Sequence, residues 1–178
     1  MFETDKIDHG YFPKYLAIAA EIGTKGRICE VGVWRGHSLT MWRSLFPFGI
    51  IVGVDNAGHS IWPERTTKIV CEQDDPSLSD KLRVITDEYD LIIDDASHNG
   101  KLTLRTRELL WPLVAPGGYY VVEDWQVAFW GDRQISPPWE ESMFQTVASF
   151  LLLLDKPESE VESIEYRYGM AILKKRRL

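Results

Sequence analysis

Short apolar runs alternate with amphipathic helical patterns along most of the chain. Apolar residues recur at helical spacing after residues 38, 101 and 142, which predicts a helix at each of these places. A further helix is expected over 75–82. The runs that predict strands are 27–31, 50–54, 68–71, 89–93 and 119–122, with a closing hairpin over 161–166 and 170–173. Strands that alternate with helices predict an α/β fold, a mostly parallel seven-stranded sheet with helices on both faces and an antiparallel C-terminal hairpin.

Acidic residues stand at or next to the carboxyl ends of the five predicted parallel strands. They are Glu30, Asp55, Glu72, Asp94, Asp95, Glu123 and Asp124. Ligands of open α/β sheets bind outside these strand ends. The placement therefore predicts a binding site, and the alternative is a solvated acidic rim that binds nothing.

The loop after the first strand, Glu30 to Ser38, has the composition of a cofactor loop. Gly32 permits a sharp turn, and Gly36 permits close approach of the backbone to a ligand. Asp55 ends the next strand, where an acid can accept both hydroxyls of a ribose. Trp34 stands where nicotinamide sites usually have a middle glycine, and Glu30 disfavours a pyrophosphate. We therefore expect S-adenosylmethionine rather than NAD, and the alternative is a glycine-tolerant turn without a ligand.

The stretch from Asp94 to His98 predicts metal chemistry. Its two carboxylates and the pair Glu123–Asp124 end neighbouring strands, about 5 Å apart in a parallel sheet. Adjacent carboxylates need a cation, and Mg²⁺ prefers such hard oxygen ligands. His98 is a candidate general base, and the alternative is that it caps the following helix.

The segment 125–138 is expected to be a long loop rich in aromatic residues. Trp125, Phe129, Trp130 and, just beyond it, Trp139 lie close to the acidic stretch. They either stack on a sugar or aromatic acceptor or pack the loop onto the core.

Composition narrows the class of protein. The chain has 178 residues, which suits a single domain over 1–178. Its formal net charge of −7 argues against a nucleic-acid partner, apart from the short basic tail at 174–177. No apolar run reaches the roughly 20 residues of a membrane span, and no secretory signal is evident. Cys29 and Cys71 lie in apolar stretches and predict reduced thiols in a cytoplasmic protein.

Two segments carry a resemblance to a known family. The run 28–38 resembles the cofactor motif of class I S-adenosylmethionine-dependent methyltransferases, in the version found in Mg-dependent macrolide and antibiotic-sugar O-methyltransferases. The run 70–76 is similar to the adenine-side segment of those enzymes. The resemblance extends from about Arg27 to Lys174 and implies the Rossmann-like class I methyltransferase fold.

The resemblance also implies roles for individual residues. It implies a small-molecule acceptor with sugar-like hydroxyls and leaves a homo-oligomer open. Metal ligands would be Asp95, Glu123 and Asp124, with His98 as the base; cofactor contacts would be Glu30, Gly32, Arg35, Gly36, Ser38, Asp55, Glu72, Gln73 and Asp94. Whether Asp94 or Asp95 holds the metal is left open.

Two other functions remain as alternatives. The cephalosporin hydroxylase-like proteins carry much the same motifs, and a noncatalytic nucleoside-binding module would need only the cofactor loop. The chain also departs from fuller members of the family. Only 56–67 separates the second and third strands, which is short for a crossover helix, and we expect neither an N-terminal domain nor a long insertion to cover the acceptor.

Overall fold

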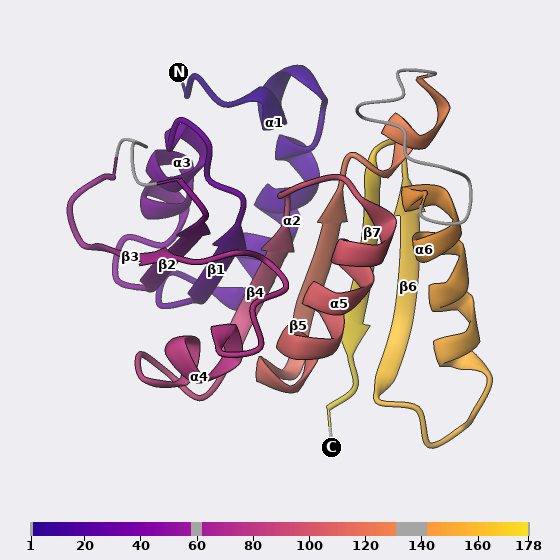
Figure 1. Ribbon diagram of the computed structural model, residues 1–178. Coiled ribbons are helices and arrows are strands. Elements are labelled where there is room, and N and C mark those ends of the chain that lie inside the picture. Colours follow the sequence, from indigo (N-terminus) through magenta and orange to yellow (C-terminus); the bar gives the residue numbers. More distant parts are fainter. Residues whose placement is uncertain (1, 58–61, 131–141, 178) are drawn as a thin grey trace.

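The computed structural model describes residues 2–57, 62–130 and 142–177 (Figure 1). Seven strands form one sheet in the order β3-β2-β1-β4-β5-β7-β6. Their bounds are β1 (Arg27–Val31), β2 (Ile50–Asp55), β3 (Thr66–Val70), β4 (Tyr89–Asp94), β5 (Val114–Glu123), β6 (Val161–Arg167) and β7 (Met170–Lys175). The first five strands pair in parallel, and β7 pairs antiparallel with β5 and β6. This is the class I methyltransferase fold, and it confirms the predicted sheet and its C-terminal hairpin.

Helices cover both faces of the sheet (Figure 1). Their bounds are α1 (Asp5–Asp8), α2 (Phe12–Ile22), α3 (His37–Leu45), α4 (Leu78–Arg83), α5 (Gly100–Leu110) and α6 (Met143–Ser149), with 3-10 turns η1 (Trp111–Leu113), η2 (Trp125–Phe129) and η4 (Phe150–Leu154). Side chains of α2 and α3 pack with one face of the strands, and those of α4, α5 and α6 pack with the other. Each buried strand therefore contributes alternate residues to two apolar cores, as its continuous apolar sequence predicts.

Two features of the fold bear directly on the site. The parallel pairing places Val31 beside Val54 and Asp94, and Asp94 beside Val122, so β1, β2, β4 and β5 end at one edge. At that edge, α1 and the start of α2 add an N-terminal segment that the strand pattern does not predict. Of the connection between β2 and β3, residues 56–57 and 62–65 are described and contain no helix, in agreement with its short length. Among the described helices, none is long and apolar enough to cross a membrane.

Candidate functional site

A cavity of about 500 Å³ lies at the carboxyl ends of the strands. Its wall combines the loop after β1, the end of β2, the segment after β3, the loop after β4 and the N-terminal residues 3–6. The predicted site residues on this wall are Gly32, Arg35, Ser38, Asp55, Glu72, Gln73, Asp95, His98 and Asp124. The position agrees with the general rule for ligand sites in open α/β sheets.

The two glycines of the loop after β1 are required by the backbone. Gly32 has φ +90°, and a Cβ on it would lie 2.0 Å from the carbonyl oxygen of Asp95. Gly32 therefore lets β1 approach the loop that carries Asp95. Gly36 has φ +86° and is the N-cap of α3, so its left-handed conformation starts the helix. It is not on the cavity wall, and the expected close approach of a ligand to Gly36 stays a prediction.

Asp55 organises the same loop from the end of β2. One of its oxygens, Oδ2, accepts hydrogen bonds from the backbone N–H groups of Val33 and Trp34, both at 2.8 Å. The other, Oδ1, accepts from the N–H of Ala57 at 2.8 Å. The carboxylate thus fixes the cavity wall, and it also stands where the ribose contact is predicted.

The other two residues predicted on the adenosine side differ from each other. Glu72 is exposed, and both of its carboxylate oxygens lie 3.3 Å from Nδ2 of Asn56. Gln73 is buried and uses both ends of its amide within the protein. It donates to Oγ1 of Thr106 at 2.9 Å and accepts from the N–H of Ser97 at 3.1 Å. Gln73 therefore positions the loop after β4, and of these two residues only Glu72 has a side chain exposed to a ligand.

Asp95, His98 and Asp124 form a cluster at the rim of the cavity. Ligand atoms from these three side chains lie within 4.8 Å of one another. Two ligands of one Mg²⁺ are separated by up to about 4.2 Å, twice the usual bond length. Small side-chain movements would therefore let this set hold a divalent cation, and its two hard carboxylates suit Mg²⁺.

Three residues around the cavity have unusual backbone conformations. Trp34, His98 and Asp124 have φ values of +47°, +52° and +56°, in the left-handed region. Such a conformation costs a non-glycine residue roughly 1–2 kcal/mol. Backbone strain of this kind clusters at functional sites. Here it lies at the ends of β1, β4 and β5, next to the predicted metal and cofactor.

The structure removes the capping alternative for His98. The N-cap of α5 is Asn99, whose side chain accepts from the N–H groups of Lys101 and Leu102. His98 instead directs Nε2 toward Oδ2 of Asp124, at 3.9 Å, with its side chain 26% exposed. His98 is thus placed to contact a bound molecule rather than the helix.

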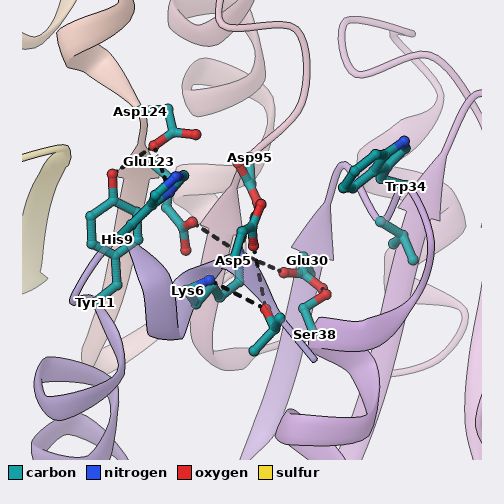
Figure 2. A network of polar contacts seen from close by, with 12 residues as sticks. Asp5, Lys6, His9, Tyr11, Glu30, Trp34, Ser38, Asp95, Glu123 and Asp124 are labelled. Carbon is teal, nitrogen blue, oxygen red and sulfur yellow. Dashed lines mark hydrogen bonds and ion pairs between the residues drawn. The ribbon is translucent and has the colours of Figure 1, made fainter. Parts of the chain in front are cut away.

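The N-terminal segment contributes a buried lysine that the sequence does not reveal (Figure 2). Lys6 is 1% exposed, and its ammonium nitrogen Nζ lies 2.7 Å from Asp95, 2.8 Å from Glu123 and 3.2 Å from Glu30. Burial alone would lower the pKa of Lys6, but the three carboxylates hold this pKa well above its usual value. Lys6 is therefore a fixed positive charge between the ends of β1, β4 and β5.

Two tyrosines of the same N-terminal segment donate hydrogen bonds to Asp124 and Glu123. Tyr11 donates to Oδ1 of Asp124 at 2.6 Å, and Tyr15 donates to Oε1 of Glu123. His9 also lies near Asp124, with 3.6 Å between its Nδ1 and Oδ1 of that residue. Nothing in the strand pattern marks these residues; the only sequence signal is the aromatic pair four residues apart at the start of a helix.

Two of the predicted site residues, Glu30 and Glu123, are buried behind the cavity wall. Glu30 is fully buried, with Lys6 as its counter-ion and Ser38 donating to it at 2.5 Å. Glu123 is 2% exposed and is held by Lys6 and a tyrosine. Neither is on the cavity surface, and the roles expected of them, a cofactor contact for Glu30 and a metal ligand for Glu123, stay predictions.

Asp94 points away from Asp95, as successive strand residues do. It is 2% exposed and accepts a 3.4 Å hydrogen bond from Tyr120, within the layer under α5. Burial, followed by the charge of Asp95, raises the pKa of Asp94 to about 7. Of the two acids only Asp95 faces the cavity, and the cofactor contact expected of Asp94 stays a prediction.

The aromatic segment after Asp124 begins as a 3-10 turn rather than a loop. Trp125 and Phe129 pack with Phe144 of α6 at ring-centroid distances of 5.2–6.5 Å. Trp130 is 53% exposed, and Trp139 lies outside the described residues. Packing on α6 supports the interpretation that Trp125 anchors the segment to the core.

Comparisons with known proteins point to one group of enzymes. The chain is 37% identical over 112 residues to demethylmacrocin O-methyltransferase of Streptomyces fradiae, which covers 58% of this chain and 28% of that protein. It is 38% identical over 112 residues to mycinamicin VI 2''-O-methyltransferase of Micromonospora griseorubida, with the same coverage. No protein-family model matches the chain. The matched segment spans less than a third of these relatives.

Solved structures extend the similarity to nearly the whole chain. MycE methyltransferase from the mycinamycin biosynthetic pathway, in complex with Mg, SAH and mycinamycin VI, superimposes with a TM-score of 0.79 at 27% identity. This superposition covers 94% of the chain but 50% of MycE. A putative caffeoyl-CoA O-methyltransferase from Staphylococcus aureus, at 16% identity and a TM-score of 0.65, shows the shared fold alone.

Proposed function

We infer that the chain is a methyltransferase of the kind that it resembles, the macrolide-sugar O-methyltransferases; it spans about half the length of the solved relative that it matches. We propose that it transfers a methyl group from S-adenosylmethionine to a hydroxyl of a sugar-bearing small molecule, with Mg²⁺ bound at the same site. One observation carries the proposal: the cluster of Asp95, His98 and Asp124 opens onto the cavity that the cofactor loop lines.

The residues of this chain divide into three tasks. Asp55 fixes the cofactor loop through two backbone amides, and Glu72 offers its carboxylate to the adenosine side. Asp95 and Asp124 would hold the cation. When bound, S-adenosylmethionine supplies the electrophilic methyl group, and the divalent cation supplies orientation and acidification of the acceptor hydroxyl.

His98 has the task of removing the proton. Methyl transfer to a hydroxyl would release the hydroxyl proton, and His98, which lies on the cavity wall beside Asp124, would accept it. The products are the methyl ether, S-adenosylhomocysteine and a protonated imidazole. A histidine nitrogen bound to the cation has no lone pair for a proton, so this role places that nitrogen outside the ligand set.

Calorimetry tests the cofactor part of the proposal. S-adenosylhomocysteine should bind at micromolar affinity and NAD more weakly. Asp55→Ala should weaken binding by about 1.5–3 kcal/mol, the range for hydrogen bonds to a charged group. Tighter binding of NAD than of S-adenosylhomocysteine would overturn the cofactor assignment.

Chelation tests the metal part. Methyl transfer to a panel of glycosylated macrolides should stop in EDTA and return with Mg²⁺ or Mn²⁺. Binding of S-adenosylhomocysteine should largely survive EDTA, because Asp55 and Glu72 lie on β2 and after β3 rather than beside the acidic cluster. Full transfer in EDTA would exclude a role for the metal, and cofactor binding without transfer to any acceptor would favour a noncatalytic module.

A further inference from the structure

The N-terminal residues 3–6 form one part of the cavity wall. Lys6 fixes this segment, because its buried ammonium group pairs with carboxylates at the ends of β1, β4 and β5. The helix α1 has only four residues, so it has little stability of its own and depends on this anchor. Lys6 is buried, whereas the preceding residue, Asp5, is exposed and lines the cavity (Figure 2). The anchor therefore presents the carboxylate of Asp5 to a bound ligand.

The other acids on the described cavity wall have tasks already. They are Glu3, Asp55, Glu72, Asp95 and Asp124. Asp55 binds backbone N–H groups of the cofactor loop, and Glu72 lies on the adenosine side. The two aspartates at the ends of β4 and β5 belong to the cluster proposed for the cation. The side chain of Glu3 is 85% exposed and lies 3.9 Å from His37. Asp5 is then the acid best placed for a cationic group of a ligand in the cavity.

The basic side chains on the same wall also differ in their partners. Lys6 is surrounded by three carboxylates, and His98 lies beside Asp124. Arg35 stacks on the ring of Trp34, with 4.4 Å between its guanidinium carbon and the ring centroid. Within the described residues, no carboxylate forms an ion pair with Arg35. A guanidinium that stacks on an aromatic ring keeps its edge N–H groups available, and these groups match the geometry of a carboxylate.

The order of the strands indicates how a cofactor would lie in the cavity. Glu72 follows β3 and Asp55 ends β2, so the adenosine side lies at this end of the sheet order. The acidic cluster and His98 lie at the ends of β4 and β5, so the methyl group would face these strands. The remaining described parts of the wall are the loop after β1 and residues 3–6. The amino-acid end of the cofactor would therefore lie against the two segments that carry Arg35 and Asp5.

We propose that Asp5 and Arg35 recognise the amino-acid end of S-adenosylmethionine, with the carboxylate of Asp5 facing its α-ammonium group and the guanidinium of Arg35 facing its α-carboxylate. This inference rests on the proposed function and assigns residues to one part of the cofactor. Opposite charges on two separate segments of one cavity complement a zwitterion and favour it over a nucleoside without these groups. Asp94, for which the resemblance implies a cofactor contact, is buried under α5 and does not line the cavity.

Calorimetry with four ligands tests each contact separately. The ligands are S-adenosylhomocysteine, its deaminated analogue, its decarboxylated analogue, and methylthioadenosine, which lacks the amino-acid end. Asp5→Asn should weaken the binding of S-adenosylhomocysteine and of the decarboxylated analogue by about five- to tenfold, between the effects typical of an exposed ion pair and of a hydrogen bond to a charged group. Binding of the deaminated analogue should not change, because this ligand has no ammonium group for Asp5 to contact.

The variant Arg35→Gln should show the complementary pattern. It should weaken the binding of S-adenosylhomocysteine and of the deaminated analogue, and it should leave the decarboxylated analogue unchanged. The matched controls remove the same charges elsewhere: Asp8→Asn on α1 and Arg105→Gln on α5, neither of which lines the cavity. Both controls should bind all four ligands as the unmodified protein does. Methylthioadenosine should bind equally to every variant, which shows that the cofactor loop is intact.

Two kinds of outcome would overturn the proposal. If Asp5→Asn weakens the deaminated analogue as much as S-adenosylhomocysteine, or if Asp8→Asn has the same effect, the loss comes from the fold or from net charge. The proposed function would then stand, because S-adenosylhomocysteine still binds. If the unmodified protein binds neither S-adenosylhomocysteine nor methylthioadenosine, the cofactor assignment fails and this proposal fails with it.

A direct observation decides if a variant does not fold. In crystals of the unmodified protein with S-adenosylhomocysteine, the ammonium nitrogen should lie within hydrogen-bond distance of Asp5, and the carboxylate within hydrogen-bond distance of Arg35. Contact of the ammonium group with other side chains, and none with Asp5, would contradict the proposal and leave the cofactor assignment in place.

Discussion

At the residue scale, the site depends on side chains whose positions are fixed by contacts elsewhere. Asp95 is oriented by Lys6, and Asp124 is oriented by Tyr11. His98 and Asp124 are held in left-handed conformations that only surrounding structure can maintain. Such support is what a positioned general base and a metal-binding carboxylate require.

The first prediction concerns His98. His98→Ala should reduce the single-turnover rate of methyl transfer by roughly 10²–10⁴-fold, the usual contribution of a general base. Binding of S-adenosylhomocysteine should be unchanged, and added imidazole should restore part of the rate. His37→Ala is a suitable comparison, because His37 also lines the cavity but pairs with Glu3 at 3.9 Å, away from the acidic cluster. A normal rate in the His98 variant, or equal rescue of both variants, would exclude its role as base.

At the element scale, the strand pattern predicts nearly all of the sheet and the edge at which the site lies. Buried parallel strands leave a clear signal, because both faces must be apolar and the polar residues gather at the ends. The pattern fails for α1 and α2. In the sequence, a buried lysine that pairs with three carboxylates cannot be distinguished from a solvated lysine. The partners of Lys6 are 24 to 117 residues away along the chain. Successive residues at the end of β4 point to opposite faces of the sheet, so only one of Asp94 and Asp95 can face the cavity. The sequence does not reveal which face that is, and the structure does.

The second prediction concerns the packing of the β1 loop against the β4 loop. Gly32→Ala should lower the free energy of unfolding by more than Gly23→Ala, as measured by urea titration. Both glycines have a positive φ, +90° and +82°, so both alanines carry a backbone cost of about 1 kcal/mol or more. A Cβ on Gly23 has no heavy atom within 4 Å, whereas on Gly32 it would meet the Asp95 backbone. Gly32→Ala should also weaken Mn²⁺ binding, and equal stability of the two variants would show that the loops separate freely.

At the scale of the whole molecule, the two ends of the sheet have different tasks. The carboxyl ends of the strands carry the cavity, the acidic cluster and the left-handed residues Trp34, His98 and Asp124. At the opposite end, Arg27 at the start of β1 and Asp90 near the start of β4 form an ion pair. The backbone N–H, Nε and Nη2 of Arg27 donate to the carboxylate of Asp90 at 2.8, 3.0 and 2.7 Å. This ion pair therefore joins the two central strands far from any predicted ligand.

The last prediction uses this separation. Burial raises the pKa of Asp90, but the hydrogen bonds and charge of Arg27 outweigh it and hold the pKa below its usual value. A carboxyl group whose pKa is lower in the folded state stabilises the fold above its unfolded pKa of about 4, and this stability is lost as the pH falls through the folded value. Asp90→Asn should therefore lower the free energy of unfolding by about 1–3 kcal/mol at pH 7. The difference from the unmodified protein should shrink below pH 4, as urea titrations at several pH values would show. Affinity for S-adenosylhomocysteine should not change; a loss of affinity comparable with that of Asp55→Ala would mean that the two ends of the sheet are energetically coupled.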